Sequence, residues 1–381
     1  GNFPMIAYTH LMKGLEDWEP DRQKRSNHII QNMLYMVELN QVNVDVSRNI
    51  FGKDANIVCG SFLEDGWQDG FPKQFDIIMG NPPYNKDGVG KGGGVFWRVF
   101  VNKSLELLNT NGYLTFVHPL GWRKPFKEGD RNYNAGKIFY DFKRIGHLHY
   151  ICISDKKIPN FPKVDYYVFQ KKNKPNPITH VVNKYKSTEQ HSHINVSNLE
   201  FIPNLITPLC SSILNKLMVD KGQKLNIVRD QSFKVSKDDL IKAKGVPHAW
   251  TPSQNEYKIV YKEYNTIPEY ITQNKVILTH VAGSSKLHNN LFAKYYSTPI
   301  GVTSMPMYQL VDNKKQGIQL ENYFNSKLIT FLIKITQYTE GQFACNDFKI
   351  LNMISMPLGL KDEPTDQDIY DYYGITKEEQ E

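Results

Sequence analysis

Apolar residues in the first 120 positions follow helical and strand-like spacing in turn. Helical spacing covers residues 5–15, 21–32, 42–50 and 97–108, and short apolar runs at 33–37, 56–59, 75–79 and 113–117 predict buried strands. Helices that alternate with strands predict a doubly wound, mostly parallel α/β sheet. Ligands of such sheets bind at the carboxyl ends of the strands. Glu38, Ser61 and Asn81 all fall at or just after a predicted strand end, so we expect them at one edge of the sheet.

The pattern changes after about residue 144. Residues 147–154 and 164–170 alternate like antiparallel strands, and the second closes the sheet as a hairpin. Residues 171–177 are rich in Lys, Asn and Pro, which is typical of a linker. Beyond it, short segments are broken by Pro and Gly, and an apolar stripe predicts a helix over 320–336. The sequence therefore predicts a second, mixed α+β domain.

Charge is unevenly distributed along a chain whose net charge is +7. Residues 1–150 hold 18 basic against 16 acidic residues, whereas residues 151–250 hold 16 against 8 and residues 351–381 hold 2 against 8. A basic middle segment suits a polyanionic partner. A well-solvated, lysine-rich surface explains the same counts equally well, so charge alone leaves both interpretations open.

Composition excludes several classes of protein. No apolar run approaches the roughly 20 residues that cross a bilayer, and the N-terminus lacks the layout of a signal peptide. The four cysteines form no C-x-x-C pair, so neither a metal site nor a disulfide framework is indicated. We expect a protein of the cytoplasm with no membrane partner and no metal.

Asn81-Pro82-Pro83-Tyr84 directly follows the apolar run 75–79. The two prolines fix φ and offer no N–H, so the backbone is stiff and its carbonyl groups remain available as acceptors. The Asn81 side-chain carbonyl and the Pro82 carbonyl can accept the two hydrogens of an –NH2 group. Tyr84 supplies a face for stacking of a planar base or amide. The tetrapeptide thus favours chemistry at an amine.

This tetrapeptide resembles the catalytic motif of amino methyltransferases, above all the N6-adenine DNA methyltransferases. The resemblance covers about residues 1–170, in the gamma arrangement, and is greatest to the large methylases of restriction-modification systems. It implies a Rossmann-like, S-adenosylmethionine-dependent catalytic domain over residues 1–175 and a DNA target-recognition domain with an acidic tail over residues 176–381. It also implies double-stranded DNA as partner, base flipping, and a restriction endonuclease subunit or domain as a further partner.

The resemblance also implies residues that bind the cofactor. Glu38 would accept the ribose hydroxyls, Leu39 would cover the adenine, and Asn81 would lie beside the methyl group. The remaining matches are the Gly-Asn-Phe that ends the family's glycine-rich loop and the Ser-Phe after the third strand: Gly1, Asn2, Phe3, Ser61 and Phe62. Two departures are that Ser61 replaces a frequent Asp, and that the first strand and most of the glycine-rich loop are absent. We therefore expect a piece of a longer protein, or one that lost an N-terminal segment.

Contacts with the target DNA are predicted on both sides of the tetrapeptide. In the family an aromatic residue stacks on the other face of the flipped base, and Phe161 is the candidate, although a core role is equally open. We expect His118 to line the pocket wall. The predicted DNA contacts lie in a glycine-rich flap, in a basic segment after a strand and in a polar loop: Lys91, Arg123, Lys124, Ser284 and Lys286.

Two rival functions remain at this level. Asn-Pro-Pro-Tyr also serves in enzymes that methylate protein glutamine or a base of ribosomal RNA, although these rarely carry a basic domain of such length. The other rival is a DNA-binding specificity module that has lost catalysis, for which the truncated glycine-rich loop is the best argument.

Overall fold

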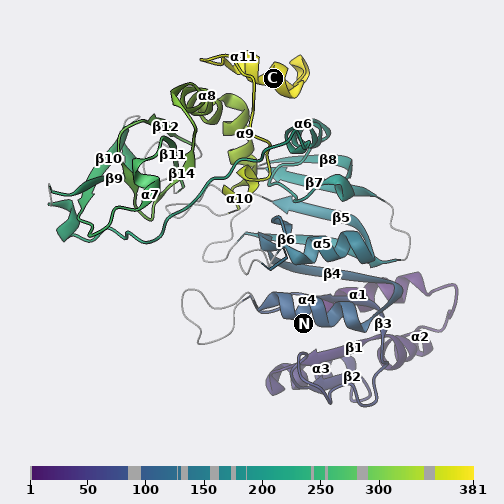
Figure 1. The fold of residues 1–381 in the computed structure, drawn as a ribbon. Coiled ribbons are helices and arrows are strands. Elements are labelled where there is room, and N and C mark those ends of the chain that lie inside the picture. The colour runs from purple at the N-terminus through teal and green to yellow at the C-terminus, as the bar shows by residue number, and fades with distance from the viewer. Residues whose placement is uncertain are drawn as a thin grey trace. The chain divides into compact units, whose positions relative to one another are not determined.

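The chain divides into two compact units. The computed structural model describes residues 2–84, 96–126, 128–129, 136–154, 163–172, 177–185, 187–241, 244–253, 256–280, 291–338 and 348–381. The first unit comprises Gly1–Trp122 and Lys137–His191, and the second comprises Arg123–Gly136 and Ser192–Glu381. In Figure 1 the first unit runs from purple to teal and the second is mainly green and yellow.

The N-terminal part of the first unit follows the predicted alternation of helices and strands. Its elements are α1 (Asn2–Gly14), α2 (Arg22–His28) continued by a π-helical turn (Ile29–Met33), β1 (Tyr35–Glu38), α3 (Gln41–Phe51) and β2 (Asn56–Cys59). Side-chain caps explain two helix starts: Asp21 accepts from the backbone N–H groups of Gln23 and Lys24, and Asn40 accepts from that of Val42. Ile29, Val44 and Ile57 share one core, against which α1 packs.

The main sheet of the first unit has six strands in the order β3-β4-β6-β5-β7-β8. They are β3 (Phe75–Gly80), β4 (Leu108–Pro119), β5 (Gly146–Ser154), β6 (Val164–Lys171), β7 (Ile178–Tyr185) and β8 (Thr188–Asn195). Strands β3 and β4 are parallel, and β6 pairs antiparallel with both β4 and β5, which confirms the predicted hairpin. Helices α4 (Trp97–Leu107) and α5 (Lys137–Ile145) lie on the viewer's side of this sheet in Figure 1. The α/β fold class is as predicted.

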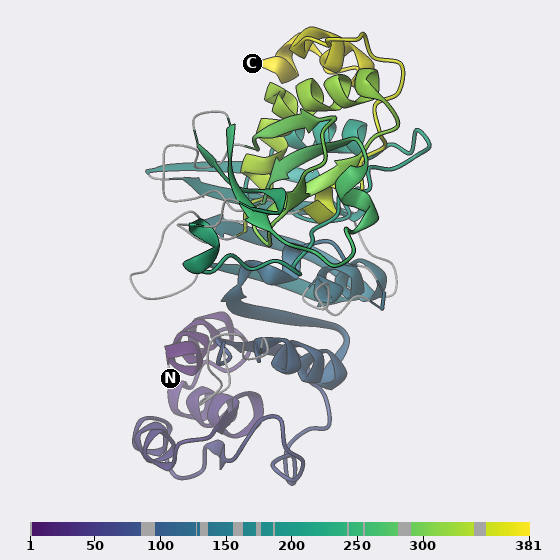
Figure 2. The same ribbon diagram turned by 60° about the vertical axis from the view of Figure 1, so that its left-hand side comes forward.

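Strands β1 and β2 form a separate parallel pair. Within the described residues β1 has only β2 as a neighbour, and β3 has only β4. The structure thus divides the predicted sheet into a two-stranded and a six-stranded part, both visible from a second direction in Figure 2.

The first unit extends beyond the linker predicted at residues 171–177. Strand β7 pairs in parallel with β5, and Val181 and Val182 on β7 are fully buried. The division into units therefore falls at residues 191 and 192 rather than at residue 175, where we predicted it.

The second unit contains two small sheets around a shared core. Their orders are β10-β9-β13 and β12-β11-β14. The strands are β9 (Val246–Ser253), β10 (Glu256–Lys262), β11 (Lys275–Thr279), β12 (Ala293–Tyr296), β13 (Gly301–Val302) and β14 (Pro306–Leu310). Ala249 and Val302 from the first sheet pack with Ile277 and Tyr308 from the second. This mixture of strands and helices is the predicted α+β composition.

Helices make up the rest of the second unit. They are α6 (Pro208–Met218), α7 (Glu269–Thr272), α8 (Lys314–Asn325), α9 (Lys327–Thr336), α10 (Phe348–Leu351), α11 (Asp366–Tyr373) and α12 (Lys377–Gln380). The single helix predicted over 320–336 is divided at Ser326, whose extended backbone (φ −66°, ψ 158°) ends α8 and whose hydroxyl caps α9 at Ile329. Within the described chain, no helix combines the length and apolarity needed to cross a membrane.

The acidic C-terminal segment is folded. Thr365 and Thr376 form capping boxes at the starts of α11 and α12. The Tyr373 hydroxyl lies 2.9 Å from that of Tyr323 in the interior, and Lys216 Nζ lies 2.6 Å from a Glu379 carboxylate oxygen. These residues are therefore part of the second unit and not a solvated tail.

Candidate active site

The tetrapeptide Asn81-Pro82-Pro83-Tyr84 begins where β3 ends. Gly80 closes the strand, and a side chain there would meet the Phe116 ring of β4 at 3.3 Å, so glycine allows the two strands to run close together. Pro82 is buried, whereas Asn81 is exposed and Tyr84 is half-buried. The sequence thus presents the Asn81 amide and the Tyr84 ring at the carboxyl end of a strand that pairs in parallel with β4, as predicted.

The side chains of Asn81 and Tyr84 lie near each other. Burial raises the pKa of the Tyr84 hydroxyl, and the neighbouring Asn81 side chain lowers it by a smaller amount. The Asn81 amide offers a carbonyl oxygen that can accept a hydrogen bond and an N–H group that can donate one.

Helix α4 connects this tetrapeptide to the segment after β2. The Phe96 N–H donates to the Tyr84 carbonyl at 3.2 Å. Phe96 then meets Phe100 edge-to-face at 5.4 Å between ring centroids, and Phe100 stacks on Phe62 at 5.8 Å. Trp67 also stacks on Phe62, with 5.4 Å between the ring centroids. The structure therefore brings two of the predicted segments together through a row of aromatic rings.

Phe96, Phe100 and Trp67 were not predicted from the sequence. Phe96 and Phe100 are four residues apart and so share one side of α4, a spacing that is visible in the sequence. The spacing does not reveal that this side faces Phe62, because that contact joins segments far apart along the chain.

Glu38 and Gly60 meet at the ends of β1 and β2. The Gly60 N–H donates to the Glu38 carbonyl at 3.0 Å, which holds the two strand ends together. One carboxylate oxygen of Glu38 accepts from the Asn40 N–H at 2.9 Å, and the other is unbonded within the described residues. Leu39 is 73% exposed beside it. An oriented carboxylate next to an exposed apolar side chain fits a ribose and the face of an adenine ring.

The start of α1 lies outside these contacts. Asn2 and Phe3 are exposed, and within the described chain neither makes a hydrogen bond or ring contact with the segments at Glu38, Phe62 or Asn81. Gly1 lies outside the described residues. Their assignment to the cofactor remains a prediction.

His118 is a core residue and does not line a pocket. It is fully buried, stacks on Trp97 at 4.0 Å between ring centroids, and pairs with the Tyr167 hydroxyl at 3.1 Å. Burial lowers the pKa of His118 to about 3, so the ring is neutral in the folded protein. Its role is to fix the first turn of α4 against β4.

The predicted contact of Arg123 with DNA is wrong. It is 0% exposed, and its guanidinium donates to the carbonyl oxygens of Ile202 and Pro203 at 3.1 and 2.6 Å. A further N–H bonds the Asn204 side chain at 3.0 Å. A guanidinium enclosed in this way cannot reach a phosphate, so Arg123 has a structural role within the second unit.

The other predicted DNA contacts stay predictions. Lys124 is half-buried with its ammonium group 5.5 Å from the centre of the Tyr338 ring. The remaining four residues lie outside the described residues: Lys91, Phe161, Ser284 and Lys286.

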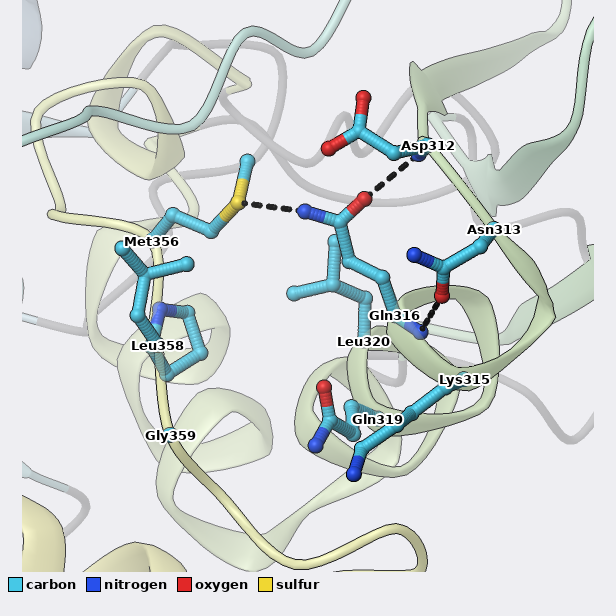
Figure 3. Close-up of a pocket in the computed structure, with 10 residues that line it drawn as sticks. Asp312, Asn313, Lys315, Gln316, Gln319, Leu320, Met356, Leu358 and Gly359 are labelled. Atoms are coloured by element: carbon cyan, nitrogen blue, oxygen red, sulfur yellow. Dashed lines mark hydrogen bonds between the residues drawn. The ribbon is translucent and has the colours of Figure 1, made fainter.

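A pocket in the second unit has no part in this site. It lies between the start of α8 and the segment 356–359, and Gln316 stands at its centre in Figure 3. The Asp312 N–H donates to Gln316 at 2.6 Å, and Gln316 donates to the Met356 sulfur at 3.4 Å. Its polar groups are thus bonded to one another. Elsewhere in the described chain, no group of three or more His, Cys, Asp or Glu side chains could hold a metal ion.

A known family matches the part of the chain that carries the tetrapeptide. Residues 15–150 match the model of the Eco57I restriction-modification methylases. This match confirms the resemblance inferred from the sequence, and with it S-adenosylmethionine as the cofactor of the domain. No curated protein matches the chain.

Several solved structures are similar to the chain. They include the M protein of the type I restriction enzyme EcoKI (19% identity, TM-score 0.34, 45% of this chain and 39% of that one) and a type I methyltransferase subunit from Streptococcus thermophilus (17%, 0.31, 39% and 36%). A third is the type IIL restriction-modification enzyme MmeI in complex with DNA (8%, 0.48, 83% and 54%). The chain spans little more than half, or less, of the length of each.

Proposed function

We propose that this chain transfers a methyl group from S-adenosylmethionine to the N6 amine of a flipped adenine in duplex DNA, within a restriction-modification system. The observation that carries the proposal is the place of Asn81-Pro82-Pro83-Tyr84 directly after β3, at the carboxyl end of a strand that pairs in parallel with β4. The family match over residues 15–150 supports the same class of reaction. Sequencing the DNA of cells that express the gene, with detection of N6-methyladenine, tests the proposal.

The tetrapeptide supplies the acceptors for the amine. Asn81 and the Pro82 carbonyl accept its two hydrogens, and the Tyr84 ring stacks on the base, which must leave the duplex to reach them. When bound, S-adenosylmethionine provides an electrophilic sulfonium methyl group. Positive charge grows on N6 as it attacks, so acceptors fixed at this atom stabilise the transition state more than the ground state.

Glu38 is the residue we propose for the ribose of the cofactor. Glu38→Ala is expected to weaken S-adenosylmethionine binding by about 1.5–3 kcal/mol, because it removes hydrogen bonds to a charged group. Isothermal calorimetry measures this change. Glu106→Ala, which removes a carboxylate from the end of α4, serves as the matched control and should leave the affinity unaltered. Equal affinity of Glu38→Ala and the unsubstituted chain would remove Glu38 from the site.

Duplex DNA is the partner we propose for the second unit, in which residues 201–250 hold 8 basic against 4 acidic residues. Exposed lysines at Lys234, Lys237 and Lys244 belong to its basic stretch. Neutralising phosphates releases counterions, so binding is expected to weaken with salt at a log–log slope of about −0.9 per contact. Changing these three lysines to Gln removes up to three phosphate contacts. Each lost contact should make the slope shallower by about 0.9. Fluorescence anisotropy with a labelled duplex measures the slope.

The control replaces three lysines of the first unit by Gln: Lys13, Lys53 and Lys73. It makes the same change in net charge and should keep the slope of the unsubstituted chain. A flat salt response, or equal binding to single strands, would contradict the DNA assignment. A flat response would favour a protein substrate for the same tetrapeptide, whereas salt-dependent binding with no preference for a duplex would favour ribosomal RNA.

A further inference from the structure

Arg98 occupies the first turn of α4, directly beside the contacts that build the site. On one side of it, the Phe96 N–H bonds the Tyr84 carbonyl at 3.2 Å. On the other, Trp97 stacks on the buried His118. The backbone that carries Arg98 is therefore fixed relative to the catalytic tetrapeptide.

Arg98 has no partner for its charge among the residues that the structure describes. Its side chain is half-buried, and its Nε atom is buried without a hydrogen bond. Throughout the described part of the chain, it makes neither a hydrogen bond nor an ion pair. Other buried or half-buried arginines donate to backbone carbonyl oxygens: Arg25, Arg123 and Arg229. Arg98 differs from them in lacking any such acceptor.

The position of Arg98 is unfavourable for a positive charge. The N-terminal turn of a helix carries partial positive charge from its free N–H groups and repels a cation. Burial adds to this cost, because it lowers the pKa of the Arg98 guanidinium. A charge that no described residue neutralises at such a place indicates that a bound anion completes it.

The side of α4 on which Arg98 lies distinguishes between two anions. At 3.6 residues per turn, Trp97 and Val101 mark the buried side of the helix, and both are fully enclosed. Phe96 and Phe100 lie to one side of that line, facing Phe62. Arg98 falls on the opposite side, away from the segment proposed for the cofactor. The anion is therefore expected to come from the substrate and not from the methionine carboxylate.

We propose that Arg98 binds a backbone phosphate of the DNA strand that carries the target adenine, and so positions the flipped nucleotide over Asn81 and Tyr84. The proposal rests on DNA being the substrate. A guanidinium offers paired N–H donors that match phosphate oxygens, which suits a residue that must orient as well as attract.

Two substitutions and one control test this role in the whole chain. Arg98→Gln is expected to weaken binding of a labelled duplex about tenfold, the loss of one charged hydrogen-bonding group. It should also make the log–log salt slope shallower by about 0.9, equal to one phosphate contact. Arg98→Lys retains the charge, so the slope should persist while affinity is intermediate. Lys103→Gln removes a charge from the Phe96 side of the same helix, where Lys103 pairs with Asp65 at 3.3 Å, and should change neither quantity.

Calorimetry with S-adenosylmethionine on the same proteins separates the alternatives. Unchanged cofactor affinity in Arg98→Gln, together with the altered slope, supports the proposal. Loss of cofactor affinity with an unaltered slope would assign Arg98 to the methionine carboxylate and overturn it, as would a variant that keeps both affinity and slope. If the unsubstituted chain shows no salt-dependent duplex binding, the DNA assignment is wrong. The proposal for Arg98 is then wrong as well, because it rests on that assignment. Should Arg98→Gln lose its fold by circular dichroism, Arg98→Lys decides the question: affinity equal to that of the unsubstituted chain would overturn the proposal.

Discussion

Replacing Asn81 by alanine is expected to lower kcat by a factor of about 10² or more, the usual loss when one preorganised group that stabilises the transition state is removed. The reason is that the amine loses its side-chain acceptor. DNA affinity should barely change, because this acceptor makes no contact with phosphates.

Single-turnover kinetics with radiolabelled S-adenosylmethionine and saturating duplex measure this effect on the chemical step. Asn109→Ala is the matched control, since Asn109 bonds the Asp76 side chain at 2.8 Å on the same pair of strands without touching the tetrapeptide. Near-normal turnover of Asn81→Ala would show that the amine is held by other groups, and the proposed mechanism would be wrong.

Replacing Arg123 by alanine is expected to destabilise the second unit by about 1–3 kcal/mol, the cost of leaving a buried hydrogen-bonding group unsatisfied. The carbonyl oxygens of Ile202 and Pro203 would lose their donors in the interior. The Tyr338 ring, 5.3 Å from the guanidinium, would also lose its neighbour. Arg123→Lys should be intermediate, because an ammonium group cannot span the three acceptors as a planar fork does.

Urea unfolding gives the size of the effect, and hydrogen exchange with mass spectrometry locates it. Peptides covering residues 199–206 and α9 should lose protection first, while α1 and α3 in the first unit keep theirs. Lys234→Ala removes an exposed charge from the same unit and should cost less than about 0.5 kcal/mol. If Arg123→Ala also lowered the free energy of unfolding by less than about 0.5 kcal/mol, the structural role would be wrong. The predicted phosphate contact of Arg123 would then stand.

The order of elements in the first unit could be predicted because it depends on local spacing. The strands of the first 120 residues contain short apolar runs, and α3 and α4 each have one apolar side, so periodicity separates them. The places of the tetrapeptide and Glu38 at strand ends could be predicted for the same reason, since a strand end is a local feature. Arg123 could not be interpreted in this way, because its acceptors lie some 80 residues further along the chain.

Two boundaries were placed incorrectly for identifiable reasons. Ser326 interrupts a stretch whose apolar residues continue at helical spacing on both sides, so the pattern alone gives one helix where the serine hydroxyl begins a second. The polar residues 171–177 suggested the end of a domain, but the buried Val181 and Val182 bring the chain back to β5. In both cases tertiary contacts outweigh the composition of a few residues.

The folded C-terminal segment alters how truncation experiments on this protein should be designed. Removing residues from Asp366 onward would raise the net positive charge, which makes it a tempting way to strengthen binding to a polyanion. The same cut would take the Tyr373 hydroxyl from Tyr323 and the Glu379 carboxylate from Lys216. Any change in affinity would then mix electrostatics with partial unfolding. Single neutralisation of an exposed acid such as Glu378, whose side chain supports no such contact, separates the two effects.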